Sequence, residues 1–386
     1  MRLPTDRFTR VLPIALLSLT ALALWSCQSD AERHLPAVEE TVQRIGKRVV
    51  PDKRVDVFRV EARADGERIV LAGEVMNPNL PGELNDSLAA AFPGLAVVDS
   101  IAVLPLADLG ERTHGIVNVS VANMRREPRH GAELVNQTLL GTVLTILKED
   151  DGWMYVQNWE GYLGWVTRWS LAITDSAGAA AWKAGPQLIC TANYGQVFSA
   201  AEGEREYVLT DLTPTARLKK LGEWLDYYRV AMPDGRPGYV RKTLMTDAAA
   251  LARIDPVPER ILATARQFLG IPYLWGGTSS KGFDCSGFTQ TVYRLNNLNL
   301  PRDASQQALL GERVEAGGDD FGNVRPGDLL FFGRSPERIS HVAIYLGESR
   351  FIHSSIGVEV NSFDPEHPDY SRYRHNTFQF AKRLLQ

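Results

Sequence analysis

Cysteine is scarce in this chain, since only three of its 386 residues carry a thiol: Cys27, Cys190 and Cys285. Three cysteines exclude a network of disulfides and leave at least one sulfur without a disulfide partner. An excess of positive charge is also lacking, because the formal net charge is −4, and this argues against nucleic acid as a partner. Each cysteine therefore needs an explanation of its own.

The first cysteine lies two residues after an apolar run from Val11 to Trp25, and this run is shorter than the roughly 20 residues that span a bilayer as a helix. Arginines precede the run and Ser26 and Cys27 follow it, an order typical of an export signal. "LWSC" resembles a bacterial lipobox, in which the signal is cut before the cysteine and the thiol is lipidated. The alternative is an ordinary secretory peptide. We expect residues 1–27 to be a signal, followed by a short polar tether, "QSDAERHLP". The mature chain should then be exported and lipid-anchored to a bacterial membrane, facing the periplasm or cell envelope.

Residues 28–110 are predicted to form a small α+β unit. "VDVFRVEAR" and "ERIVLAGEV" flank Asp65 and Gly66 as a hairpin, "PGELNDSLAAAF" predicts a short helix, and "LAVVDSIAVLP" predicts another strand. No catalytic constellation is evident in this unit, and its sequence does not indicate a role.

The middle of the chain contains an internal repeat. "WMYVQNWEGYLGWV" at 153–166 and "YYRVAMPDGRPGYV" at 227–240 align without gaps at an offset of 74 residues. Each copy has an aromatic strand, an acidic-Gly turn and a Gly-aromatic-Val strand, which predicts a hairpin. We therefore expect two small β modules at residues 111–183 and 184–252, which resemble bacterial SH3-like domains; any other small β-barrel is the alternative. Cys190, in the apolar strand "QLIC", is most simply a buried core residue of the second module.

The third cysteine lies where a Gly-rich loop gives way to a helical pattern, in "KGFDCSGFTQ". A preceding helix is predicted in "PERILATARQFLG", with apolar residues through Leu269 on one face. Cys285 should occupy the first turn of its own helix, where the helix dipole and free backbone N–H groups favour a thiolate. Such a thiol is suited to act as a nucleophile.

A nucleophilic thiol needs a base, and two histidines lie on consecutive predicted strands. His341 opens "SHVAIYLG" and His353 lies in "RFIHSS", with a tight turn between the strands. An antiparallel hairpin can bring both rings to one face, so that one orients the other. His367 and His375, in a Pro-flanked loop and near the last strand, are expected to be surface residues.

Five separated motifs occur in order in the C-terminal part: "YLWGGTSSKGFDCSGFTQTVY", "LPRDASQQ", "VRPGDLLFF", "SHVAIYLG" and "FIHSS". Together they resemble the NlpC-type cysteine peptidases, a papain-like family that acts on bacterial cell-wall peptides. The resemblance covers about residues 255–386 and implies a peptidase domain at 253–386. With the SH3-like modules ahead of it, the chain resembles the γ-D-glutamyl-L-diamino acid endopeptidases of that family. The implied fold class is α+β: a papain-like catalytic domain after two SH3-like barrels and a small N-terminal unit.

The resemblance also implies roles for individual residues. Cys285 corresponds to the nucleophile, His341 to the general base and His353 to the residue that orients it. Tyr273 corresponds to a tyrosine of the oxyanion site; it could instead be a core aromatic that stacks on Trp275. The implied pocket residues are Asp284, Ser286, Asp303 and Ser305, of which Asp284 could also be a helix N-cap.

In these endopeptidases the first SH3-like module closes one end of the cleft, so that only a peptide with a free N-terminal L-Ala fits. Glu133 corresponds to the acid that holds the ammonium group, and Tyr162 to an aromatic wall. Alternatively, Glu133 could be a solvated loop acid, and Tyr162 could belong to the core of the module. The implied reaction is cleavage of the bond from γ-D-Glu to a diamino acid, diaminopimelate or Lys, through a Cys thioester.

Three competing interpretations remain open at this point. One Cys and two His could supply three zinc ligands, although neither a fourth ligand nor a C-x-x-C spacing is evident. The modules and anchor could belong to a non-catalytic wall-binding scaffold. The chain could also be a broader peptidoglycan endopeptidase, or transfer an acyl group to an acceptor other than water, on intact wall, with the SH3-like modules as wall-binding domains. We expect a monomer that acts on peptidoglycan-derived peptides and needs no metal or cofactor.

Overall fold

The N-terminal unit begins with a helix where the sequence predicted a tether. The structure is a computed structural model that describes residues 28–201, 207–317 and 320–385. Helix α1 (Asp30–Val49) starts with a capping box, in which Ser29 Oγ accepts from the Glu32 backbone N–H at 3.1 Å and the Glu32 carboxylate accepts from the Ser29 N–H at 3.0 Å. The predicted tether is therefore wrong, because Val38 and other apolar side chains one helical turn apart give α1 a buried face.

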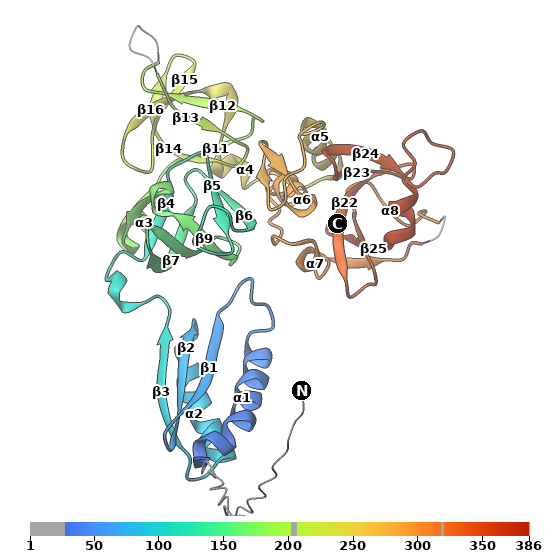
Figure 1. The fold of residues 1–386 in the computed structure, drawn as a ribbon. Coiled ribbons are helices and arrows are strands. Elements are labelled where there is room, and N and C mark those ends of the chain that lie inside the picture. Colours follow the sequence, from blue (N-terminus) through green and yellow to red (C-terminus); the bar gives the residue numbers. More distant parts are fainter. Residues whose placement is uncertain (1–27, 202–206, 318–319, 386) are drawn as a thin grey trace, which may run out of the picture.

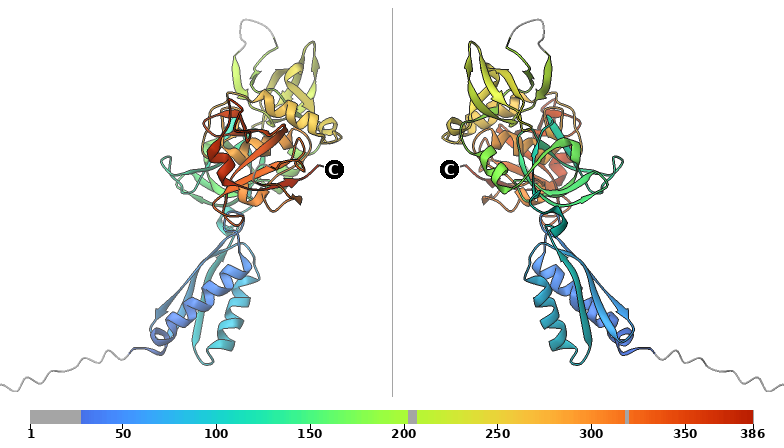
Figure 2. Two further views of the ribbon diagram at one scale, coloured as in Figure 1. Left: turned by 90° about the vertical axis from the view of Figure 1, so that its right-hand side faces the viewer. Right: turned by 90° about the vertical axis from the view of Figure 1, so that its left-hand side faces the viewer.

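A three-stranded sheet completes this unit (Figure 1). Strands β1 (Phe58–Asp65) and β2 (Arg68–Val75) form the predicted hairpin, and β2 pairs in parallel with β3 (Ala96–Val103) after helix α2 (Leu80–Ala91). The predicted helix and strands of this unit are thus confirmed. The unit extends away from the rest of the molecule in every view (Figures 1 and 2).

Two seven-stranded antiparallel sheets follow, one for each half of the repeat. The strands of the first are β4 (His114–Val117), β5 (Val121–Arg125), β6 (Leu134–Leu139), β7 (Val143–Asp150), β8 (Trp153–Gln157), β9 (Leu163–Thr167) and β10 (Leu171–Thr174). Those of the second are β11 (Gln187–Cys190), β12 (Gly195–Phe198), β13 (Val208–Leu212), β14 (Arg217–Trp224), β15 (Tyr227–Ala231), β16 (Pro237–Arg241) and β17 (Met245–Asp247). Helices α3 (Ser176–Lys183) and α4 (Ala248–Leu251) follow the two sheets in the chain.

The repeat has a structural basis. The hairpin β8–β9 pairs Trp153 with Thr167, and β15–β16 pairs Tyr227 with Arg241, which is the same register 74 residues later. Cys190 is fully buried in the second module, and burial raises the pKa of its thiol to about 11. Its predicted place in the core is confirmed.

The C-terminal domain packs helices against a six-stranded sheet of order β20-β25-β21-β22-β23-β24. The strands are β20 (Glu312–Val314), β21 (Leu329–Gly333), β22 (Ile339–Gly347), β23 (Arg350–Ser354), β24 (Val358–Ser362) and β25 (Phe378–Arg383), with a separate small ribbon of β18 (Thr278–Ser279) and β19 (Gly282–Phe283). The helices are α5 (Pro258–Gln267), α6 (Cys285–Arg294), α7 (Ala304–Gln307) and α8 (Arg372–Thr377). Helix α5 ends before Leu269, which is 48% exposed. The expectation that Leu269 lies on the apolar face is wrong, because that face ends with the helix.

The C-terminal domain contacts both modules through the loop before its nucleophile helix. Gln137 of the first module accepts the backbone N–H of Thr278 at 3.0 Å, and Lys281 forms an ion pair with Asp211 of the second module at 2.7 Å. The segment that carries Cys285 is therefore held against both modules. Within the described ranges, no helix is long and apolar enough to cross a membrane.

Candidate active site

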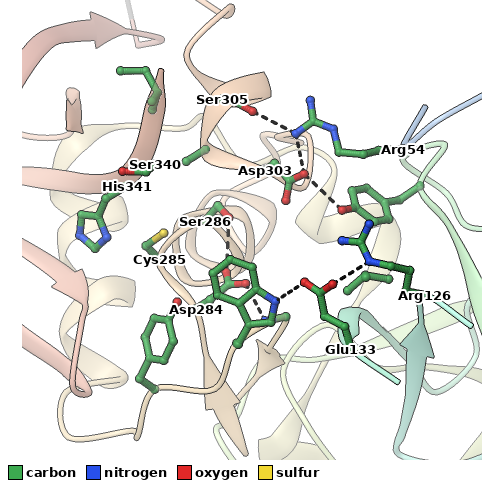
Figure 3. Close-up of a pocket in the computed structure, with 17 residues that line it drawn as sticks. Arg54, Arg126, Glu133, Asp284, Cys285, Ser286, Asp303, Ser305, Ser340 and His341 are labelled. Carbon is green, nitrogen blue, oxygen red and sulfur yellow. Dashed lines mark hydrogen bonds and ion pairs between the residues drawn. The ribbon is translucent and has the colours of Figure 1, made fainter. Parts of the chain in front are cut away.

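Cys285 is the first residue of α6, as the sequence predicted, and Asp284 is the N-cap. The Asp284 carboxylate accepts the backbone N–H of Gly287 at 2.7 Å. The helix start also requires glycine at 287, because a Cβ there would lie 2.1 Å from the carbonyl oxygen of Gly277. Cys285 lies at the wall of a cavity of about 510 Å³ (Figure 3).

The two predicted histidines meet on neighbouring strands. His341 on β22 and His353 on β23 are buried, and His341 Nε2 lies 2.7 Å from His353 Nδ1. His353 Nε2 lies 2.9 Å from Asn361 Oδ1 on β24. With the amide oxygen assigned to that position, His353 Nε2 carries a proton, so its Nδ1 accepts from His341 Nε2–H. This chain leaves His341 Nδ1 as the nitrogen that can accept the thiol proton.

Asn361 was missed in the sequence, although the strand pairing explains its place. His353 pairs with Glu359 in the β23–β24 register, so Asn361, two residues further along, projects from the same face of the sheet. The alternating residues of "VEVNS" indicate that Glu359 and Asn361 share one face of a strand. Only the pairing of β24 with β23 places that face beside His353. His367 and His375 are partly buried, and His375 lies in α8 against Phe363 rather than on the surface. Neither lines the cavity.

The electrostatics of the resting site differ from the sequence expectation. Burial, followed by the adjacent Asp284 carboxylate, raises the pKa of Cys285 to about 12. Burial also lowers the pKa of His341 well below its ordinary value, and lowers that of His353 to about 3. A neutral thiol beside a neutral imidazole follows, so the expected resting thiolate is wrong. Burial of the sulfur is the main cause of this raised pKa, and the negative charge of the Asp284 N-cap adds to it.

A buried arginine, Arg302, connects the start of α6 to the first module. Arg302 is 1% exposed, and its guanidinium forms an ion pair with Asp284 at 2.5 Å and donates to Ser286 Oγ at 3.0 Å. Arg302 also donates to Asn136 of the first module at 2.8 Å, while Asp284 accepts the Gly276 N–H at 3.0 Å. Asp284 and Ser286 line the cavity, but their side chains are bound to Arg302. They therefore anchor the helix that carries Cys285 as well as forming the cavity wall.

The cavity brings together nine of the ten predicted catalytic and pocket residues, all except His353 behind its wall: Glu133, Tyr162, Tyr273, Asp284, Cys285, Ser286, Asp303, Ser305 and His341. Burial, with the nearby Cys285 and Asp284, raises the pKa of Tyr273, so its hydroxyl stays protonated and able to donate. The Trp275 indole donates to Glu133 at 3.0 Å instead of forming part of a core with Tyr273. Cys27, the predicted lipidation site, lies outside the described residues.

The side of the cavity opposite Cys285 and His341 carries paired charges (Figure 3). Glu133 forms an ion pair with Arg126 at 2.6 Å, and this contact lowers the pKa of Glu133. Tyr162, whose ring is buried in the first module, donates its hydroxyl to Asp303 at 3.2 Å. Glu133 thus lines the cavity and is held by Arg126 and Trp275, but it lies in the loop before β6 and its side chain is 39% exposed, so it is also a partly solvated loop acid.

Arg54 also lines this side and comes from the N-terminal unit, in which the sequence indicated no site residue. It forms an ion pair with Asp303 at 2.7 Å and donates to Ser305 at 3.0 Å. Arg54 and Arg126 were missed, since nothing in the sequence around an isolated arginine indicates a partner in another domain. Among the described residues, no group of three or more His, Cys, Asp or Glu side chains is arranged to hold a metal ion.

Comparison with known proteins gives two family matches. The NlpC/P60 family matches residues 270–379, and the bacterial dipeptidyl-peptidase Sh3 domain matches residues 124–171. The chain is 31% identical over 233 residues to a γ-D-glutamyl-L-lysine dipeptidyl-peptidase of Bacillus cereus, covering 58% of this chain and 67% of that protein. It is 31% identical over 228 residues to the protein of the same name from Bacillus subtilis, covering 56% of this chain and 71% of that protein.

The fold has a solved counterpart. The crystal structure of an NlpC/P60 family protein from Bacillus cereus covers 71% of this chain and 100% of its own, with 25% sequence identity and a TM-score of 0.62. These matches confirm the predicted α+β fold class, with a papain-like catalytic domain and an SH3-like module ahead of it.

Proposed function

Because this chain belongs to the NlpC/P60 family and is a cysteine peptidase, we propose that it cleaves the bond between γ-D-Glu and a diamino acid, diaminopimelate or Lys, in cell-wall peptides with a free N-terminal L-Ala. One observation carries the proposal: Glu133 and Tyr162 of the first module line the same cavity as Cys285 and His341. A module that forms a wall of the catalytic cavity limits which peptides can enter. The Bacillus relatives are named γ-D-glutamyl-L-lysine dipeptidyl-peptidases, which is in line with this specificity.

The proposed reaction begins with attack of Cys285 Sγ on the γ-carbonyl carbon of D-Glu, while His341 Nδ1 takes the thiol proton. The Cys285 backbone N–H and the Tyr273 hydroxyl donate to the oxyanion. His341 returns the proton to the amino nitrogen of the diamino acid, the C–N bond breaks, and a thioester remains on Cys285. Water, deprotonated by His341, then hydrolyses the thioester and restores the thiol. The neutral thiol and neutral imidazole of the resting site suit a proton transfer that accompanies attack.

The amino group of the substrate is proposed to bind between Glu133, Tyr162 and Asp303. Two carboxylates and a phenol oxygen are acceptors for the three N–H donors of an ammonium group. An N-acylated peptide lacks this charge and carries an extra group that has to fit beyond its first residue. Preference for a free amine is therefore expected.

Glu133→Ala should lower kcat/KM on L-Ala-γ-D-Glu-diamino acid by roughly 10- to 150-fold, because a charge-assisted hydrogen bond to the substrate is lost. The rate on the N-acetylated peptide, already low, should change much less. The measurement is chromatography of released diamino acid at several substrate concentrations. Glu127→Ala is a matched control, since Glu127 belongs to the same module and pairs with Arg129 on the surface. Equal wild-type rates on the free and N-acetylated peptides would refute the proposed amine site.

A second candidate is a broader peptidoglycan endopeptidase or acyltransferase that acts on intact wall. The pairing of Glu133 with Arg126 and of Asp303 with Arg54 favours it, because each acid of the amine site already has a cationic partner. An uncharged, acylated N-terminus would not need a free acid. The same comparison of free and acylated peptides separates the two candidates, and mass spectrometry of the products separates hydrolysis from transfer.

We further propose that the mature chain is exported and lipid-anchored at Cys27, on the basis of "LWSC" at the end of the apolar run. Cys27→Ser should then release the protein from the membrane fraction or block its processing, since the acceptor thiol is removed. Membrane fractionation and mass spectrometry of the N-terminal peptide measure both effects. A wild-type mature N-terminus at any residue other than Cys27 contradicts the anchor.

A further inference from the structure

The segment at residues 52–55 of the N-terminal unit, between α1 and β1, bridges the first module and the catalytic domain. On the module side, the backbone carbonyl of Arg54 accepts the Leu163 N–H at 2.8 Å, and that of Val55 accepts from the Gln157 side chain at 2.8 Å. Leu163 follows Tyr162 in the chain, and Gln157 of β8 pairs with Leu163. The Tyr162 hydroxyl donates to Asp303 at the cavity. The segment is therefore fixed to the module at the edge of the proposed amine site.

On the catalytic side, the same segment binds the start of helix α7. Arg54 bonds Asp303 and Ser305 with one guanidinium nitrogen, at 2.7 and 3.0 Å, and the Gln306 side chain donates to Asp52 at 2.9 Å. Asp303 is the N-cap residue of α7. Two residues of the N-terminal unit thus hold three polar side chains within four positions of the chain, Asp303, Ser305 and Gln306, at the edge of the cavity.

Asp52 orients the Arg54 guanidinium. Arg54 Nε and its second terminal nitrogen both donate to the Asp52 carboxylate at 2.8 Å, and this pairing lowers the pKa of Asp52 to about 2. One edge of the planar group is occupied by Asp52, so the other is directed at Asp303. A guanidinium held in this way has little freedom to rotate out of the wall, and Figure 3 shows its other edge directed at Asp303 and Ser305.

Arg54 is also one of the residues between two cavities. A second cavity of about 240 Å³ lies between the N-terminal unit and the first module. Four residues line both this cavity and the active-site cavity: Arg54, Arg126, Val135 and Tyr162. Truncation of the Arg54 side chain would remove part of the partition and provide space beyond the first residue of a bound peptide.

We propose that Arg54 is a positioning and specificity-determining residue, which fixes the Asp303 carboxylate for the substrate ammonium and closes the cavity against N-acylated peptides. The inference rests on the proposed function and adds a role for the N-terminal unit in it. The unit thereby becomes part of the substrate site and not only a spacer before the modules.

The test measures binding without turnover, by calorimetry in a Cys285→Ala background, with L-Ala-γ-D-Glu and its N-acetyl derivative as probes. Arg54→Ala should raise the Kd of the free-amine dipeptide by about tenfold, because Asp303 loses its fixed position. The N-acetyl derivative should bind equally well or better, so the ratio of the two Kd values falls. Arg54→Lys keeps the charge but cannot bind Asp52 and Asp303 with two edges, and should give an intermediate ratio. Arg68→Ala, in the same unit and paired with Asp65 at 2.9 Å, is the matched control.

Three outcomes for Arg54→Ala overturn the proposal. An unchanged ratio of the two Kd values shows that Arg54 does not discriminate between free and N-acylated peptides. Equal weakening of both ligands shows a merely structural role. Tighter binding of the free amine shows that Arg54 competes with the substrate for Asp303. Lack of discrimination in the Cys285→Ala parent instead refutes the proposed function itself, and Arg54→Lys keeps the test valid if thermal unfolding shows that the alanine variant is misfolded.

Discussion

Cys285→Ala is expected to lower kcat/KM on L-Ala-γ-D-Glu-diamino acid by at least about 10⁴-fold, because no other group can form the covalent intermediate. The fold should persist, since the change removes one sulfur atom at a cavity wall and leaves the N-cap of α6 in place. Cys190→Ala is the matched control, because it removes a buried thiol from the second module without touching the cavity. Product formation by mass spectrometry and thermal unfolding of each variant measure the two effects.

The intermediate itself provides a more direct readout. Rapid acid quenching of wild-type turnover should trap L-Ala-γ-D-Glu on the peptide that contains Cys285, as a thioester that hydroxylamine removes. The Cys285→Ala variant should show no such adduct. Full activity in that variant, or wild-type activity that collapses with a chelator, would contradict the thiol mechanism.

His341→Ala is expected to lower kcat/KM by roughly 10³- to 10⁴-fold, because Cys285 then lacks its proton acceptor. The effect should be almost as large as loss of the thiol, since burial raises the pKa of Cys285 to about 12 and so the site has little thiolate without a base. His353→Asn should be milder, because an amide oxygen can still accept from His341 Nε2–H. If His353→Asn lowers kcat/KM as much as His341→Ala does, the assignment of His353 as the orienting residue is contradicted.

The acid limb of the pH profile tests the same assignment. Burial lowers the pKa of His341, so the neutral base persists below the pH at which an ordinary histidine becomes protonated. The loss of kcat/KM on acidification should therefore begin well below pH 6.5. The profile is measured from pH 4 to 8, with thermal unfolding at each pH as a control for the fold. An acid limb centred at the ordinary histidine pKa would contradict a buried, neutral base.

Local sequence patterns predicted where Cys285, His341 and His353 lie, and the family resemblance implied their roles. Cys285 was predictable because a Gly-rich loop changes to helical spacing at that residue, and α6 begins there. His341 and His353 were predictable because two alternating runs flank a tight turn, which forces a hairpin with both rings close together. The repeat of the β modules was likewise visible, since strand alternation and turn residues act over a few positions. Such features depend on neighbours in the chain, which is the range over which a sequence pattern carries information.

The tertiary structure alone decided how the centre is held and where its cavity ends. Arg54 and Asp303 are 249 residues apart, and Arg302 and Asn136 are 166 apart; both pairs form where separate domains pack together. The charge state of Cys285 also depended on the fold, because burial and Asp284 outweigh the helix dipole that the sequence indicates. Contacts between domains and the extent of desolvation follow from how folded surfaces dock, and no period or spacing along the chain encodes them.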